Sequence, residues 1–370
     1  MIVGVLKEPD FENRVSLLPE IIPSLIKKGI QVFVETNAGI KASCNDDDYA
    51  KNGALVKSKK EVIAASDILL SINSPSVIGN RSSVIAIGIY QPLYNAELMR
   101  DWAKQNITVF SLDMLPRTTR AQSMDVLSSQ ANIAGYKAVL LAANSYPRYF
   151  PMFMTAAGSI PPAKVLILGA GVAGLQAIAT ARRLGAVVEV FDTRPAVKEE
   201  VMSLGAKFIE VEGAADASKA GGYAVEQSET FLQKQKEKIA ESIAKADVVI
   251  TTAQIPGKKA PLLVSAEMIT AMKKGSLIID LAAATGGNTD LTRNNETVNF
   301  NGISITGNSF LASSMPYDAS KMYGKNVLNF LQLIIDKEGK LNLNFEDDLV
   351  EGSCIAHNGE VVNERVKSLL

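Results

Sequence analysis

Hydrophobic and polar residues follow two different periods along this chain, and the period changes at regular intervals. Short apolar runs that fit buried strands alternate with amphipathic segments that have the spacing of a helix. Towards the N-terminus, strands are predicted at residues 2–6, 31–35, 67–72, 84–90 and 108–112, and helices at 19–28, 59–66 and 96–105. Strands that alternate with helices form parallel βαβ units, so these residues predict one α/β domain.

A second series of the same kind follows a long connecting helix. Residues 126–144 are rich in alanine and leucine and predict a single helix. Beyond it, strands are predicted at 165–168, 187–191, 206–211, 248–251, 277–280 and 303–306, with helices at 224–246 and 318–335. Residues 212–223 are nearly all small, and we expect them to form a mobile loop that ends at Tyr223.

The first strand of the second series runs into a glycine-rich turn. Gly169, Gly171 and Gly174 stand directly after the strand and at the start of a helix, with Val172 and Ala173 between the last two glycines. The first glycine permits a tight turn, the second lets a pyrophosphate approach the backbone, and the third lets helix and strand pack closely. The amides at the helix N-terminus can then bind phosphates, so the turn predicts a dinucleotide site.

An acidic residue at the end of the next strand bears on the choice of nucleotide. Asp192 lies eighteen residues after Gly174, where a carboxylate accepts a hydrogen bond from the ribose 2′-hydroxyl and repels a 2′-phosphate. This favours NAD(H), with Thr193 as the next residue of the site. Arg194 leaves NADP(H) open, because a guanidinium can accept that phosphate.

Composition narrows the class of protein. The 370 residues suffice for two domains, and the net charge of −1 gives no reason to expect nucleic acid or an anionic membrane as a partner. Cys44 and Cys354 are too few for a disulfide framework and too isolated for a metal site. No apolar run approaches the roughly 20 residues that cross a bilayer, so we expect a soluble chain without direct membrane insertion. His357 is the single histidine, and histidine is the usual proton-transfer residue of dehydrogenases.

A polar segment precedes the connecting helix and has two interpretations. It contains Arg117, Gln122, Asp125 and Ser128, and helical spacing would put the last three near one face. Helix capping, with Thr119 as the N-cap, explains some of the pattern but not the convergence of these four residues. A ligand-binding role for the four is the other interpretation.

Several motifs together resemble one family. The run R-T-T-R-A-Q-S-M-D-V-L-S-S-Q from Arg117 and the turn G-A-G-V-A-G resemble the NAD(H)-binding component, the alpha subunit, of proton-translocating nicotinamide nucleotide transhydrogenase. So do G-V-L-K-E near the N-terminus, T-T-A-Q-I-P-G-K-K-A-P from residue 251 and M-P-Y-D-A-S from residue 315. The resemblance covers nearly the whole chain, and a relationship to alanine dehydrogenase is also visible. It implies two Rossmann-like doubly wound parallel-sheet domains, separated by a cleft and joined by long helices: residues 1–126 with 318–370, and residues 127–317.

The resemblance also implies roles for individual residues. Arg117, Asp125 and Ser128 would hold the nicotinamide, and Gln122 would reach towards its ribose and the neighbouring NADP(H)-binding component. Further positions around the bound nucleotide would be Gly222, Tyr223, Gln235 and Gln254. The chain departs from the family pattern at Tyr90, Ala284, Thr285 and Asn308.

The function that the resemblance implies is that of an NAD(H)-binding transhydrogenase subunit. Hydride would pass directly between NAD(H) on this chain and NADP(H) on a partner subunit, coupled to proton translocation through membrane-spanning subunits. Such a transfer needs no general base, which agrees with the single histidine. The chain would be a homodimer, docked peripherally on the cytoplasmic face of the inner membrane.

Two other functions are weighed against this one. An NAD-dependent enzyme of the alanine dehydrogenase type would need a lysine and a histidine in the first domain, and residues 73–75 and 89–90 supply neither. A non-catalytic NAD(H) sensor would need nucleotide affinity but no polar segment beside the nicotinamide. Both remain alternatives.

Overall fold

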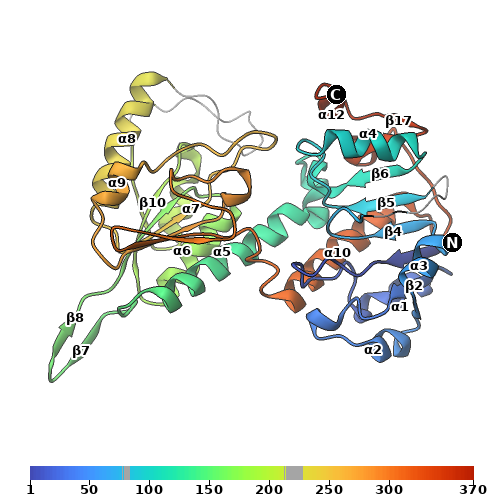
Figure 1. The fold of residues 1–370 in the computed structure, drawn as a ribbon, viewed down its shortest axis with the longest axis horizontal. Helices are drawn as coiled ribbons and strands as arrows, with labels where there is room; N and C mark the ends of the chain where they lie inside the picture. Colours follow the sequence, from blue (N-terminus) through green and yellow to red (C-terminus); the bar gives the residue numbers. More distant parts are fainter. Residues whose placement is uncertain (77, 79–83, 212, 214–227) are drawn as a thin grey trace. The chain divides into compact units, whose positions relative to one another are not determined.

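The computed structural model describes residues 1–76, 78, 84–211, 213 and 228–370, which form two compact α/β units (Figure 1). The first unit consists of Met1–Gln130 and Ser313–Leu370, and the second consists of Ala131–Ala312. Each unit is built on its own, predominantly parallel sheet. The doubly wound architecture expected from the alternating pattern is confirmed in both.

The sheet of the first unit has the strand order β17-β16-β6-β5-β4-β1-β2-β3. Its strands are β1 (Ile2–Val5), β2 (Gln31–Glu35), β3 (Leu55–Lys57), β4 (Ile68–Leu70), β5 (Ile85–Gly88), β6 (Thr108–Ser111), β16 (Cys354–His357) and β17 (Glu360–Val361). The first six strands are parallel in the Rossmann order, whereas β16 and β17 continue the sheet in antiparallel pairing. The five predicted strands of this unit are present, and β3, β16 and β17 were not predicted.

Helices cover both faces of this first sheet. One face packs against α1 (Ile22–Ile26), α2 (Asp46–Lys51), α10 (Pro316–Ile334) and α11 (Asp348–Ser353), and the other against α3 (Lys59–Ala65), α4 (Ala96–Lys104) and α12 (Glu364–Lys367). Leu70 and Phe110 contribute to the first core, and Leu69 and Val109 to the second. Adjacent strand residues therefore face opposite layers, so these strands are apolar throughout rather than alternating.

The sheet of the second unit has the order β11-β10-β9-β12-β13-β15-β14. Its strands are β9 (Lys164–Leu168), β10 (Val187–Phe191), β11 (Lys207–Phe208), β12 (Val248–Thr251), β13 (Leu277–Asp280), β14 (Thr297–Phe300) and β15 (Ile303–Gly307). All pairs are parallel except β14 with β15, and β14 is the strand that the sequence did not predict. α5 (Val126–Ser145), α6 (Val172–Arg183) and α7 (Lys198–Ser203) cover one face, and α8 (Glu229–Ile243) and α9 (Ala266–Thr270) cover the other.

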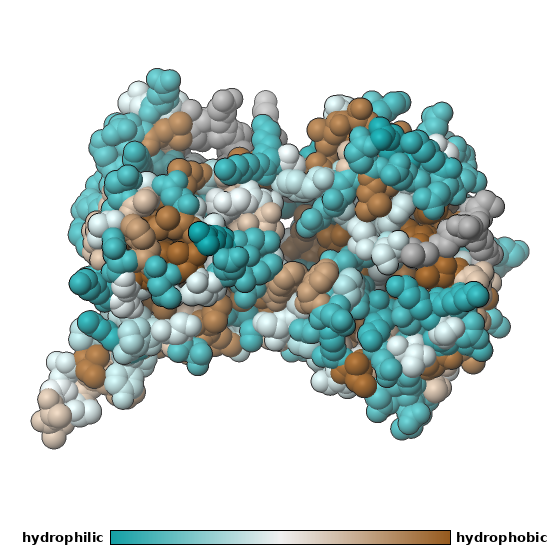
Figure 2. All heavy atoms as spheres, in the orientation of Figure 1, coloured by the Kyte–Doolittle hydropathy of each residue, from teal (hydrophilic) through white to brown (hydrophobic). Residues whose placement is uncertain are grey.

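A two-stranded arm extends from the second unit at β7 (Phe153–Thr155) and β8 (Gly158–Ile160) (Figure 1). All six of its strand residues are exposed, and hydrophobic atoms show on the arm in Figure 2. Met154 is the most exposed of its hydrophobic side chains, at 77%. Among the helices that the structure describes, none is both long enough and apolar enough to span a bilayer.

The isolated thiols and the single histidine have structural surroundings in the first unit. Cys44 and Cys354 are free and buried, as the sequence predicted. His357 lies on β16, with its Nδ1 3.0 Å from the hydroxyl of Thr108 and its ring against Phe345. Burial lowers the pKa of His357, so the ring is more readily neutral than a histidine in water.

Candidate functional site

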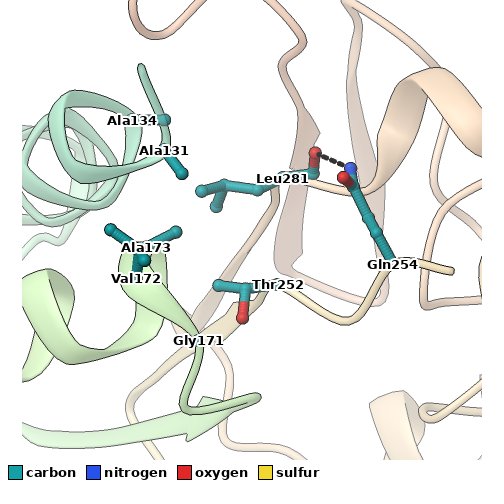
Figure 3. Close-up of a pocket in the computed structure, with 8 residues that line it drawn as sticks. All are labelled: Ala131, Ala134, Gly171, Val172, Ala173, Thr252, Gln254 and Leu281. Atoms are coloured by element: carbon teal, nitrogen blue, oxygen red, sulfur yellow. Dashed lines mark hydrogen bonds between the residues drawn. The ribbon is translucent and has the colours of Figure 1, made fainter. Parts of the chain in front are cut away.

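A cavity of about 200 Å³ opens in the second unit at the carboxyl edge of its sheet (Figure 3). It is lined by Ala131, Ala134, Gly171, Val172, Ala173, Thr252, Gln254 and Leu281. Gly171 follows β9 and Thr252 follows β12, and these two neighbouring strands are where the strand order reverses. Open α/β sheets bind ligands at this topological switch point, so the cavity has the position of a ligand site.

The glycine-rich turn has the geometry that a phosphate cradle requires. Gly169 has φ +108°, a left-handed conformation that makes the tight turn possible. A Cβ on Gly174 would lie 1.9 Å from the carbonyl oxygen of Gly169, so only glycine lets α6 approach the end of β9 this closely. A Cβ on Gly171 would meet nothing within 4 Å, and this open space lies beside the first turn of α6.

The start of α6 supplies hydrogen-bond donors to that space. The first intrahelical bond runs from the amide of Leu175 to the carbonyl of Gly171, 2.8 Å away. The amides of Val172, Ala173 and Gly174 precede it and have no acceptor within the helix. Together with the positive end of the helix dipole, they suit an anion such as a pyrophosphate. The residues therefore fit the phosphates of a dinucleotide.

Asp192 follows β10 and orders the same turn. Its Oδ2 accepts the amide of Ala170 at 2.7 Å, and its two oxygens accept the guanidinium of Arg194 at 2.9 and 2.8 Å. Hydrogen bonding to Asp192 raises the pKa of Arg194. The carboxylate is thus in place for a ribose, but its oxygens are shared with Arg194, which must give up hydrogen bonds before ribose hydroxyls can take them.

The loop after β12 forms the wall opposite the glycine-rich turn. The hydroxyl of Thr252 donates to the carbonyl of Gly169 at 3.1 Å, and the side-chain amide of Gln254 donates to the carbonyl of Leu281 at 3.0 Å. Figure 3 shows the second of these bonds across the loops that follow β12 and β13. Gln254 was a candidate by resemblance, whereas Thr252, Leu281, Ala131 and Ala134 were not predicted. Thr252 and Leu281 could have been found as the residues that directly follow the predicted parallel strands.

The polar segment lies in the first unit, and its local structure differs from the prediction. Thr119–Met124 is a 3-10 helix, and no side chain caps it. The prediction that Thr119 is an N-cap was therefore wrong. Asp125 has extended backbone angles and caps α5 instead: its Oδ1 accepts the amide of Ser128 at 2.9 Å and its Oδ2 accepts the Ser128 hydroxyl at 2.5 Å.

This break at Asp125 also overturns the argument that Gln122, Asp125 and Ser128 share one α-helical face. Gln122 belongs to the 3-10 helix and is exposed, as is Arg117. Only Asp125 and Ser128 stand in α-helical register, and there they bond to each other. The neighbouring Arg120 forms ion pairs with Asp347 and Asp348, which anchors the segment to the start of α11.

The remaining candidates are unevenly placed. Gln235 lies on the buried face of α8, and its Oε1 has no hydrogen-bond partner among the described residues. Thr193 follows Asp192 and is half-buried. Gly222 and Tyr223, like the loop predicted at 212–223 apart from Gly213, lie outside the described residues.

The matching edge of the first unit's sheet is filled by its own side chains. Glu8 follows β1 and accepts the amides of Ile72 and Asn73 at 2.5 and 3.0 Å, across the switch point between β1 and β4. Tyr323 of α10, fully buried, donates its hydroxyl to the carbonyl of Ser71 at 3.2 Å. These buried side chains take the place that the cavity has in the second unit.

Comparison with known proteins agrees with this geometry. The model of the alanine dehydrogenase/PNT N-terminal domain matches residues 4–134, and that of the C-terminal domain matches residues 138–364. A chain of NAD(P) transhydrogenase subunit alpha from Rhodospirillum rubrum is 43% identical over 364 residues, which cover 95% of each chain. The chain belongs to the alanine dehydrogenase/PNT family.

Within this family the high identities are to the transhydrogenase alpha subunits, as the motifs indicated. The crystal structure of transhydrogenase from Sinorhizobium meliloti has a TM-score of 0.89 and 44% identity, and the match covers 98% of this chain and 100% of that one. A solved L-alanine dehydrogenase has a TM-score of 0.83 at 23% identity, covering 100% and 99%. The alanine dehydrogenase structure therefore shares the fold, whereas the transhydrogenases are similar in sequence as well.

Proposed function

We propose that this chain is the NAD(H)-binding alpha subunit of a proton-translocating NAD(P) transhydrogenase, and that it exchanges hydride directly with NADP(H) held by a partner subunit. The observation that carries the proposal is the open space at Gly171 beside the donors of α6, in a chain of this family. Bound NADH supplies the hydride. The chain's own residues bind the nucleotide, orient it and exclude water.

The cavity assigns these tasks to particular groups. The amides at the start of α6 hold the pyrophosphate, and Asp192 accepts the ribose hydroxyls once Arg194 yields its hydrogen bonds. A carboxylate at this position repels a 2′-phosphate, which supports NAD(H) on this chain and NADP(H) on the partner. Leu281 and Ala134 add apolar surface to the wall.

The polar segment would act on the nicotinamide side of the bound nucleotide. Arg117 and Gln122 are exposed, so a ligand or a partner can reach them, whereas Asp125 and Ser128 would present a hydrogen-bonded pair. Nucleotide contacts from Gly222, Tyr223, Gln235 and Gln254 belong to the same proposal. A hydride transfer places no demand on a general base, and the structural setting of His357 agrees with this.

The partners would be an NADP(H)-binding component and membrane-spanning subunits, with this chain docked peripherally on the cytoplasmic face of the membrane. Association with a second copy is supported by the arm of β7 and β8. An isolated two-stranded hairpin with exposed hydrophobic side chains is marginal in water, so the arm gains stability when another chain covers it.

A mixing experiment tests the proposed function. The protein is combined with an NADP(H)-binding transhydrogenase component, and hydride transfer from NADH to an NADP⁺ analogue is followed by absorbance. Transfer that requires both proteins is expected. No transfer, together with NADH-dependent amination of pyruvate by this chain alone, would replace the proposal with an alanine dehydrogenase function. NADH binding with neither reaction would favour a sensor.

Gln122→Asn tests the polar segment within the same assay. The shorter side chain is expected to slow hydride transfer far more than it weakens NADH binding, because Gln122 would position the reacting groups rather than hold the nucleotide. Equal losses in transfer and in binding would reduce Gln122 to an ordinary residue of the binding surface.

A further inference from the structure

The loop after β12 has little regular structure of its own, yet it carries two residues of the cavity wall. Thr252 and Gln254 line the cavity, and Ala253 lies between them in the sequence. From Thr252 to Pro261 the chain forms turns and coil without a strand or helix. The positions of the two wall residues therefore depend on contacts that reach the loop from outside.

Asn288 provides the main contacts of this kind. Its Oδ1 accepts the amide of Ala253 at 3.1 Å, while its Nδ2 donates to the carbonyl of Ala253 at 2.9 Å and to the carbonyl of Pro261 at 2.8 Å. One side chain thus binds both polar groups of Ala253 and the far end of the same loop. Asn288 is fully buried, and both of its side-chain N–H groups are used.

Asn288 is in turn fixed to the sheet. Its amide donates to Oδ2 of Asp280 at 2.7 Å, and its carbonyl accepts the amides of Leu263 and Val264 at 2.9 and 3.0 Å. Asp280 is the last residue of β13, is fully buried and also accepts the hydroxyl of Thr292 at 2.6 Å. The rigid end of β13 therefore determines where the carboxamide of Asn288 stands.

We propose that Asn288 is a positioning residue for the NAD(H) site. It does not line the cavity, but it holds Ala253 so that Thr252 and Gln254 stay in the wall. With Thr252 so placed, its hydroxyl reaches the carbonyl of Gly169 in the glycine-rich turn, and Gln254 reaches the carbonyl of Leu281. The inference rests on the proposed function, since it assigns a role in NAD(H) binding.

The experiment compares NADH affinity with thermal stability in Asn288→Ala and in a matched control. The control, Asp247→Ala, removes another buried polar side chain of the second unit, one that accepts the amide of Lys164 and pairs with Lys273 at the amino edge of the sheet. Both variants are expected to lower the melting temperature. Only Asn288→Ala is expected to raise the Kd for NADH, by about tenfold, the change that about 1.4 kcal/mol produces. Equal effects of the two variants on Kd would overturn the inference.

A double-mutant cycle with Gln254→Ala tests the route of the effect. If Asn288 acts through the wall, Asn288→Ala raises the Kd less in the Gln254→Ala background than in the wild type. Full additivity would overturn the proposal. Should Asn288→Ala fail to fold, Asn288→Ser serves in its place, because its hydroxyl keeps one small polar group in the buried space.

Failure of this inference and failure of the proposed function give different results. A wild-type chain that does not bind NADH refutes both. A wild-type chain that binds NADH and transfers hydride, with Asn288→Ala and Asn288→Ser binding NADH equally well, refutes only the role of Asn288.

Discussion

Gly171 and Gly174 offer a pair of alanine substitutions that separates nucleotide binding from stability. At Gly171 an added Cβ meets nothing within 4 Å, and the backbone is extended, with φ −77° and ψ −171°. Alanine adopts this conformation without strain, so Gly171→Ala leaves the fold intact. At Gly174 the added Cβ would lie 1.9 Å from the carbonyl oxygen of Gly169, a backbone atom that cannot move without opening the turn.

The sizes of the two effects follow from the structure. Where the native conformation suits alanine, Gly→Ala stabilises by about 0.4–1 kcal/mol, and overpacking costs about 1–3 kcal/mol. The second unit, residues 131–312, has 182 residues (312 − 131 + 1), and in this size range 1 kcal/mol shifts the melting temperature by about 2–4 °C. We expect Gly171→Ala to melt about 1–4 °C higher than the wild type and Gly174→Ala to melt about 2–12 °C lower.

The assay pairs calorimetric melting with NADH titration below the melting temperature of each variant. Gly171→Ala is expected to lose NADH affinity by about tenfold or more despite its intact fold, because its methyl group occupies the space that the phosphates need beside the amides of α6. Wild-type affinity in Gly171→Ala would refute the phosphate cradle. Wild-type stability in Gly174→Ala would refute the close approach of α6 to β9.

Three carboxylates give further predictions. Asp192→Ala is expected to weaken NADH and to narrow the preference for NADH over NADPH, since Arg194 can then turn to a 2′-phosphate; parallel titrations measure this ratio, and an unchanged ratio would contradict it. Asp125→Ala is expected to cost about 1 kcal/mol in chemical denaturation through loss of the α5 cap, and Asp125→Ser to restore most of it; equal losses would exclude capping. Burial raises the pKa of Glu8 from 4.5 to about 7, so its contribution to stability is greatest below pH 4.5 and declines as the pH rises through about 7. Glu8→Gln is expected to remove a decline of up to about 3 kcal/mol between those pH values, and the same pH dependence in both proteins would show that Glu8 is not its source.

The sequence by itself determined the features that depend on neighbours along the chain. The glycine-rich turn, Asp192 at the end of the next strand and the helix from residue 126 were all predicted close to their observed positions. A Gly-x-Gly-x-x-Gly turn and a run of helix-forming residues act through local backbone geometry, so a short window of sequence contains the information. The apolar strands were found for the same reason, because buried parallel strands are apolar throughout.

The tertiary structure alone decided what depends on partners far apart in the sequence. Asn288 lies 35 residues from Ala253, whose peptide it holds, and no local pattern connects the two. The edge strands β14 and β16 form because a neighbouring strand offers them hydrogen bonds, not because their own residues demand it. At Asp125 the local rule predicted one continuous face with Gln122, but the break before α5 turned that carboxylate into a cap. Local propensity sets where elements begin, and long-range hydrogen bonding decides which side chains remain free to meet a ligand.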